Sequence, residues 1–371
     1  MRRSATLAST ILVGLGALGG TAAYVMYLPE PRALTFPDGK SFAFTIVDDT
    51  DMATLERSKL VYDVLHRYGL RTTKTVWVLS GTEMHHPPNS GASLSDPDYR
   101  AFILELQRRG FEIALHGVRG GSSERDDIVA GFEKFKEELG DYPRLHVNHS
   151  LNRDNVYWGT SRWSLAPLRW AHRLMSEDRF DGHDPESRYF WGDLLHQHVR
   201  YVNQYTFSDI NLRNVMRAFP YRLGDKPYVN LWFPTADGDN LDVFVELLKP
   251  ENLDRLEREG GVCLVYAHLG AGSFTRDGKV DPRFEARIAD VARRNGWFVP
   301  ASELLDFLAS QPDWNPNLTL RERLRLDALF IWTKLKRSFN GRPRARDRAA
   351  PPAQIDSDTR PMPSLETSAR A

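Results

Sequence analysis

The sequence predicts an α/β protein whose parallel strands close into a (β/α) barrel. Apolar, β-prone runs alternate along the chain with segments of helical periodicity, which is typical of successive βαβ units. Several of these runs end in carboxylates or histidines. Because the carboxyl ends of the strands form the active face of such a barrel, these side chains are expected to converge on one site.

The predicted elements follow one another through a barrel domain at residues 38–310. Strands are expected at 41–47, 72–79, 111–115, 144–149, 228–233, 262–267 and 297–299. Helices are expected at 54–68, in a segment that ends at Arg109, and at 124–139, 240–248 and 281–295. A glycine follows each of the first three helices as a stop signal. The region of about 150–226 is weakly periodic, so it is expected to form irregular insertions around the barrel.

The N-terminal segment, residues 1–29, predicts a transmembrane anchor. Met1-Arg2-Arg3 precedes a run from Ser4 to Pro29 that contains no charged residue. A bilayer span needs about 20 apolar residues, and the preceding arginines place the N-terminus in the cytoplasm. A signal peptide cleaved near Thr21-Ala22-Ala23 is the alternative. Both predict that the barrel lies outside the cytoplasm, on the periplasmic or extracellular face, and the anchor would attach it to the membrane.

The C-terminal region predicts an amphipathic basic helix at 316–339, followed by a disordered tail at 341–371, where apolar residues are few. Packing of the helix against the barrel is the first expectation, and contact with an anionic membrane surface is the alternative. The apolar stripe of this helix comprises Leu320, Leu324, Ala328, Ile331, Leu335 and Phe339.

Composition narrows the possible partners. The net charge is zero, with acids and bases mixed along the chain, which argues against a nucleic-acid partner. The single cysteine, Cys263, lies in an apolar run and is expected to be a buried hydrophobic residue. Four tryptophans are each expected to pack in the core: Trp158, Trp163, Trp170 and Trp191.

Three strand ends carry the candidate chemistry. Asp48 and Asp49 follow the first predicted strand, His116 follows the third, and His268 follows the run at 262–267. Adjacent carboxylates at the end of a buried strand repel each other and cost free energy to desolvate. Such a pair is tolerated beside a cation, so a divalent metal or a proton in transit is expected there.

These strand ends resemble the polysaccharide deacetylases of the nodulation-type group, carbohydrate esterase family four. Asp48 and Asp49 match the adjacent aspartates of the family's first motif, His116 matches the first histidine of the second, and Tyr266-Ala267-His268 resembles the last motif. The resemblance implies a distorted (β/α) barrel and metal-dependent hydrolysis of N- or O-acetyl groups on an envelope or extracellular polysaccharide. It implies Asp48 as the catalytic base, Asp49 and His116 as metal ligands, and His268 as the general acid.

The chain departs from the family pattern at the second histidine, where Gly120 stands. Since catalytic metal sites generally use three protein ligands, His149 at the next strand end is expected to supply the third, and the imidazole and carboxylate set favours Zn²⁺. His146 lies three residues earlier in the strand and is therefore expected to point to the other face, whereas the pair His85-His86 in the long second loop could also reach the site.

Arg119 and Trp232 are the predicted substrate-binding residues, although Arg119 could instead pair with a surface acid. Two other functions remain open from the sequence. One is a glycoside hydrolase on the same barrel, for which Asp48, Asp51 and Asp237 are the candidate carboxylates. The other is a non-catalytic glycan-binding or scaffold protein of polysaccharide assembly.

Overall fold

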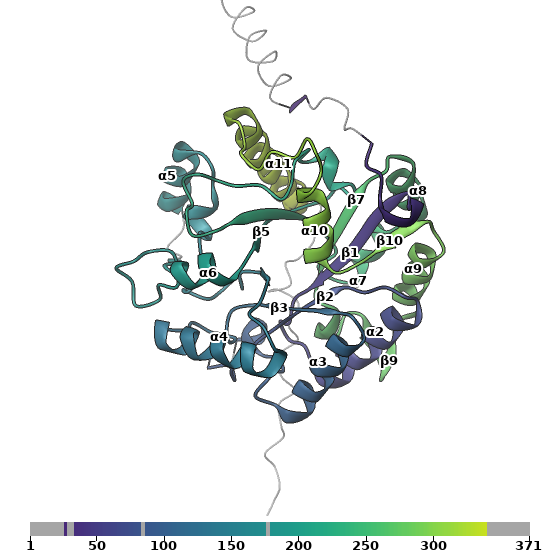
Figure 1. Ribbon diagram of the computed structural model, residues 1–371, viewed down its shortest axis with the longest axis horizontal. Helices are drawn as coiled ribbons and strands as arrows, with labels where there is room; N and C mark the ends of the chain where they lie inside the picture. The colour runs from purple at the N-terminus through teal and green to yellow at the C-terminus, as the bar shows by residue number, and fades with distance from the viewer. Residues whose placement is uncertain (1–25, 28–32, 83–85, 176–178, 340–371) are drawn as a thin grey trace, which may run out of the picture.

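The computed structural model describes residues 26–27, 33–82, 86–175 and 179–339, and these form a parallel barrel surrounded by helices (Figure 1). Seven parallel strands follow one another in chain order, and pairing of the seventh with the first closes the barrel. The barrel strands are β1 (Phe42–Asp48), β2 (Thr73–Val76), β3 (Glu112–Leu115), β4 (Leu145–His146), β5 (Tyr201–Phe207), β6 (Leu231–Asp237) and β7 (Val262–Ala267). The predicted parallel barrel is therefore confirmed.

The barrel is distorted beside β1. The short strand β10 (Gly296–Phe298) pairs with residues 42–44 of β1, while β2 pairs with residues 47–48 on the same edge. The other edge of β1 pairs with β7 along residues 43–48. The start of β1 is thus held by β10, and only its last residues reach β2.

Helices cover the outside of the barrel, and their bounds follow local sequence signals. In α2, Thr54 accepts a hydrogen bond from the Arg57 N–H as the N-cap, and Gly69, at φ +73°, lies just beyond the C-terminus. Val61 and Leu65 of this helix are buried in the core. The helices are α2 (Leu55–Arg67), α3 (Pro97–Arg108), α4 (Arg125–Leu139), α5 (Ala166–Met175), α6 (Gly192–His198), α7 (Leu241–Leu247), α8 (Pro250–Arg258), α9 (Pro282–Ala292), α10 (Ala301–Ala309) and α11 (Leu320–Phe339).

The region predicted to be irregular contributes one full barrel strand, β5. Its polar residues obscured the strand pattern, yet Asn203 and Gln204 are buried. The Asn203 amide donates to the Phe233 carbonyl at 3.3 Å, and the Gln204 Oε1 accepts from the Tyr221 hydroxyl at 2.5 Å. Since both amides have partners, the strand can pass through the interior.

The C-terminal helix α11 packs against the barrel, which was the first expectation, but through a different face from the one predicted. Leu326 and Phe330 are buried, whereas Leu320 and Leu335 of the predicted stripe are 67% and 45% exposed. The Asp327 carboxylate accepts hydrogen bonds from the Ser164 and Leu165 N–H groups and from the Tyr205 hydroxyl. A buried carboxylate with three donors fixes the helix on the barrel.

Two sequence predictions lie outside the described residues. One is the N-terminal anchor at 1–29, of which the structure describes only Met26 and Tyr27, and the other is the disordered tail at 341–371. Within the described ranges, no helix combines the length and the apolar character that a membrane span requires.

Candidate metal centre

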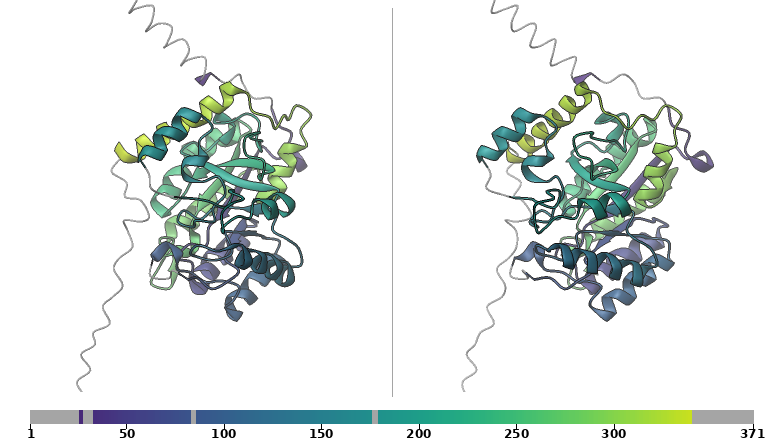
Figure 2. Two further views of the ribbon diagram at one scale, coloured as in Figure 1. Left: turned by 90° about the vertical axis from the view of Figure 1, so that its left-hand side faces the viewer. Right: turned by 60° about the vertical axis from the view of Figure 1, so that its left-hand side comes forward.

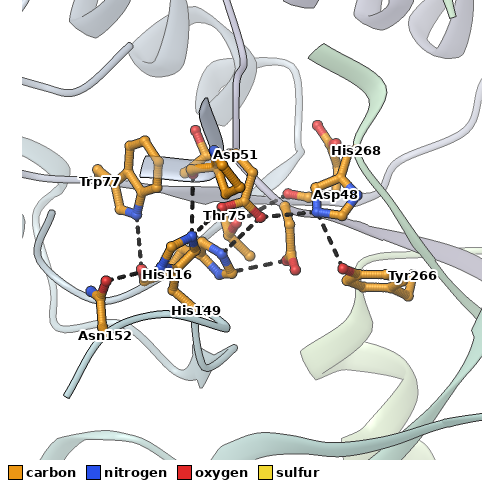
Figure 3. Close-up of polar contacts among 12 residues, drawn as sticks. Asp48, Asp51, Thr75, Trp77, His116, His149, Asn152, Tyr266 and His268 are labelled. Carbon is orange, nitrogen blue, oxygen red and sulfur yellow. Dashed lines mark hydrogen bonds and ion pairs between the residues drawn. The ribbon is translucent and has the colours of Figure 1, made fainter. Parts of the chain in front are cut away.

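Loops at the C-terminal ends of four strands bring one acidic residue and three histidines together (Figure 3). Asp51 follows β1, His116 follows β3, His149 follows β4 and His268 follows β7. All four side chains are buried or nearly so. The convergence expected at the carboxyl face of the barrel is therefore observed.

The Asp51 carboxylate is the centre of this cluster. Its Oδ1 lies 2.7 Å from His149 Nε2, and its Oδ2 lies 3.3 Å from His116 Nε2 and 2.9 Å from His268 Nε2. Burial alone would raise the pKa of Asp51, but the charges of His149 and His116 outweigh burial and hold that pKa well below its usual value. Asp51 is thus an ionised ligand or hydrogen-bond acceptor for the imidazoles around it.

The orientation of His149 is fixed by Asn152. The Asn152 Oδ1 accepts from the Gly121 N–H at 3.1 Å, and its Nδ2 donates to the Arg119 carbonyl at 3.0 Å, which sets the amide orientation. His149 Nδ1 lies 2.9 Å from the same Oδ1 and must therefore donate its proton there. This hydrogen bond directs Nε2 towards Asp51, an arrangement typical of metal-ligating histidines.

Asp49 lies in the cavity beside His116. Its Oδ1 is 3.7 Å from His116 Nδ1, too far for a hydrogen bond. Burial raises the pKa of Asp49 to about 6, although the charges of His116 and His268 oppose this shift. Both Asp49 Oδ1 and His116 Nδ1 are buried without a hydrogen-bond partner. These two atoms are therefore available to contact a bound ligand or ion.

Asp48 occupies a different environment from the one that the sequence implied. Its Oδ2 lies 3.0 Å from Lys74 Nζ and accepts from the Tyr62 hydroxyl at 3.0 Å, and its Oδ1 accepts from the Leu269 N–H at 2.7 Å. Lys74 and Asp48 are both completely buried. Asp48 does not line the cavity, whereas Asp49 and Asp51 do. Its carboxylate is therefore engaged in the barrel interior.

His268 is held between two carboxylates. Its Nδ1 lies 3.0 Å from Asp239 Oδ1, while its Nε2 lies close to Asp51 and 3.2 Å from the Tyr266 hydroxyl. Burial would lower the pKa of His268, but Asp239 and Asp51 outweigh it and raise that pKa well above its usual value. No sequence pattern singled out Asp239, although it directly follows Asp237-Gly238 at the end of β6.

The cluster opens into a cavity of about 210 Å³. Trp158 and Arg162 form part of its wall, and the Arg162 guanidinium stacks on the Trp158 ring at 3.8 Å. Phe330, Thr333 and Lys334 of α11 complete another part. Trp158 therefore borders the cavity instead of filling the core, and no sequence pattern in its weakly periodic region indicated this.

The two predicted substrate-binding residues lie elsewhere. Arg119 pairs with Asp127 at 2.8 Å, and Trp232 is only 1% exposed in the core. Neither residue lines the cavity. A role for them in substrate binding stays a prediction without support from their positions.

Neither His146 nor His86, the described ones among the other histidine candidates, belongs to a group that could hold a metal. His146 Nε2 lies 3.3 Å from Asn148 Oδ1, and its ring meets Trp191 edge-on, so it faces away from the cavity as predicted. His85 lies outside the described residues, and His86 belongs to no candidate ligand group among the residues that the structure describes.

Two overlapping groups in the described part of the chain could hold a metal ion. One comprises Asp51, His116 and His149, and the other comprises Asp49, Asp51 and His268, with the ligand atoms of each group within 4.8 Å of one another. The first group offers one carboxylate and two imidazoles, the donor set of many three-ligand catalytic zinc sites. These residues therefore fit a divalent transition metal.

Comparisons with known proteins give similarity in structure only. No protein-family model matches the chain, and no curated protein matches it. Among solved structures, it is similar to a putative polysaccharide deacetylase from Mycobacterium smegmatis, with 16% identity over 79% of this chain and 98% of the other and a TM-score of 0.45. A probable polysaccharide deacetylase from Pseudomonas aeruginosa PAO1 has 12% identity over 77% and 96% of the two chains, and the Puue allantoinase has 10% identity over the same shares, each with a TM-score of 0.45. At such values the likeness does not establish an activity, so the function must come from the site.

Proposed function

We propose that the protein is a metal-dependent hydrolase that removes acetyl groups from a saccharide, with Asp51, His116 and His149 as the metal ligands. The observation that carries this proposal is the Asp51 carboxylate, whose two oxygens face the Nε2 atoms of His149 and His116. Three buried ligands of this kind leave a further position open for water or substrate. The polysaccharide or oligosaccharide substrate and Zn²⁺ as the metal are parts of the same proposal.

The aspartates that act as base and as metal ligand differ from those that the resemblance implied. Asp49 takes the place of Asp48 as the base, because Asp49 lines the cavity and Asp48 is bound by Lys74. Asp51 takes the place of Asp49 as the carboxylate ligand. When bound, the ion supplies Lewis acidity to the acyl group and to the attacking water.

The protein groups divide the proton transfers between them. The Asp49 carboxylate accepts a proton from water as the carbonyl carbon is attacked. His268 then donates its Nε2 proton to the departing amine or alkoxide, and acetate is released. Asp239 acts on this step as a positioning residue, because its contact at 3.0 Å with Nδ1 keeps Nε2 directed into the cavity.

Glycoside hydrolysis has less support from the geometry. That reaction needs two carboxyl groups free to flank a glycosidic bond. Asp48 is paired with Lys74, and Asp51 is surrounded by three histidines.

The test combines metal binding with acetate release by the purified full-length chain. Zn²⁺ binding is measured by calorimetry, and acetate release is measured from acetylated chito- and xylo-oligosaccharides. Asp51→Ala and His149→Ala should each lose Zn²⁺ and activity, whereas the matched control His146→Gln should keep both. Asp49→Asn and His268→Ala should keep Zn²⁺ but lose at least 100-fold in turnover, a typical loss for a general acid or base.

Other outcomes would point elsewhere. Zn²⁺ retained by His149→Ala but lost by His268→Ala would assign the metal to the second ligand group. Release of new reducing ends, unaffected by a chelator, would favour glycoside hydrolysis. A parent protein that binds the saccharides without Zn²⁺ and without acetate release would be a glycan-binding protein.

A further inference from the structure

Exposed apolar side chains are concentrated on two neighbouring helices and one short segment. Eight large hydrophobic side chains are exposed among the described residues, and Val129 is the only one of these eight that lies elsewhere. The other seven are Met26, Tyr27, Trp170, Leu174, Leu320, Trp332 and Leu335. Figure 2 shows α5 in teal and α11 in yellow-green side by side at one end of the molecule. We call the exposed side of these two helices the α5/α11 face.

Both helices leave large apolar side chains exposed. In α11, Leu326 and Phe330 are buried, whereas Leu320, Trp332 and Leu335 are 67%, 56% and 45% exposed. In α5, none of the side chains that the structure describes is buried. Trp170 and Leu174 are each 67% exposed and lie four residues apart, so they share one side of that helix. Apolar surface gathered in this way marks an interaction site.

Basic residues outnumber acidic residues in the two helices. Together α5 and α11 contain eight lysines and arginines and two acidic residues, although the whole chain has no net charge. Asp327 and Arg325 are buried, and Arg169 and Arg323 pair with Asp225 at 3.0 Å and 2.8 Å. A basic helix pair with exposed tryptophan and leucine has the composition of an element that lies on an anionic bilayer.

Met26 and Tyr27 reach the same place. The uncharged run from Ser4 to Pro29 includes Met26 and Tyr27 near its end. The backbone carbonyls of these two residues accept hydrogen bonds from Arg325 and Arg321 of α11. Two residues of a run whose composition suits a bilayer thus contact the helix that exposes Trp332 and Leu335.

From these observations we infer that the α5/α11 face docks on an anionic lipid bilayer. Its tryptophans and leucines enter the interfacial region, and its lysines and arginines contact lipid phosphates. Phe330, Thr333 and Lys334 of α11 line the cavity, so the bilayer lies next to the candidate site. This inference is independent of the chemistry proposed for that site.

The test uses fluorescent labels on the full-length chain in lipid bilayers. Cys263 is completely buried, so an introduced exposed cysteine can be labelled selectively. Leu174→Cys and Leu335→Cys place an environment-sensitive dye on the α5/α11 face, and Val129→Cys places it on an exposed apolar position of α4 as the matched control. The bilayers contain phosphatidylglycerol or only phosphatidylcholine, with and without lipids carrying a doxyl quencher.

Docking predicts that doxyl lipids quench the dyes at 174 and 335 at least twofold more than the dye at 129, and that quenching is stronger with phosphatidylglycerol. Equal quenching at all three positions, or none at 174 and 335, would overturn the inference. A second copy of the chain on this face is the other outcome. It would be shown by absent quenching together with a dimer, seen by light scattering, that Leu335→Ser dissociates, and it would overturn the inference. None of these outcomes decides whether the protein binds a metal or releases acetate, so the two proposals are tested separately.

Discussion

Replacing Lys74 by methionine should destabilise the fold strongly, because it leaves a charged carboxylate buried without its cation. Lys74 Nζ and Asp48 Oδ2 are 3.0 Å apart, and both side chains are completely shielded from water. Burial would lower the pKa of Lys74, but Asp48 outweighs burial and raises it, so Lys74 keeps its charge beside the Asp48 carboxylate. Removing one partner of a buried pair costs roughly 3–5 kcal/mol. In a chain of this size about 2 °C of melting temperature corresponds to 1 kcal/mol, so Lys74→Met should melt roughly 6–10 °C below the parent.

A double-mutant cycle tests the physical reason for this loss. Asp48→Asn should destabilise the protein to a similar extent, whereas Asp48→Asn combined with Lys74→Met should recover much of the loss, because neither charge is then left unpaired. Thermal unfolding followed by circular dichroism measures all four proteins. Single variants that melt within about 2 °C of the parent, or additive effects in the double variant, would refute the reasoning. Acetate release lost by the folded double variant would return Asp48 to the role of base.

Two further predictions concern groups outside the site. Burial lowers the pKa of His146 to about 3, so the fold keeps this ring neutral while the unfolded chain binds a proton below about pH 6.5. Stability is therefore fully present above pH 6.5 and should fall by about 2 kcal/mol at pH 5, and His146→Gln should flatten this decline in urea titrations. Asp327→Ala removes the acceptor for three hydrogen bonds that hold α11, at a cost of about 1–3 kcal/mol, and should make α11 sensitive to limited proteolysis, whereas Leu320→Ala at an exposed position should not.

The sequence predicted the barrel because most of its strands are apolar runs bounded by helix and turn signals. The runs that became β1, β3 and β7 needed no knowledge of tertiary contacts. β5 could not be found in this way, because the amides of Asn203 and Gln204 are satisfied in the interior by partners far away in the chain, such as Phe233 and Tyr221. The pattern of a strand fails where buried polar groups depend on distant partners.

The positions of the three aspartates were only partly predictable from their order in the sequence. Successive side chains of a strand point to opposite faces. Asp48, the last residue of β1, therefore points to the opposite side from Asp49, and Asp51 lies in the turn that follows. That alternation was visible in the sequence, but Lys74 as the partner of Asp48 was not, because it comes from the next strand. The position of Asp239 beside His268 likewise depends on how the β6 and β7 loops meet.

The packing around Gly120 explains why a histidine cannot stand there. A Cβ at this position would lie 2.1 Å from the Asn89 carbonyl oxygen and 2.9 Å from the Trp77 ring. The loop that carries Asn89 therefore fills the space that a side chain at 120 would need. His149 Nε2 lies 3.2 Å from the carbonyl of Pro88 in this same loop, and the His149 ring meets Trp77 edge-on. The residues that close the position of Gly120 thus help to hold His149 against Asp51, so the packing that excludes a side chain at 120 also positions a ligand of the proposed site.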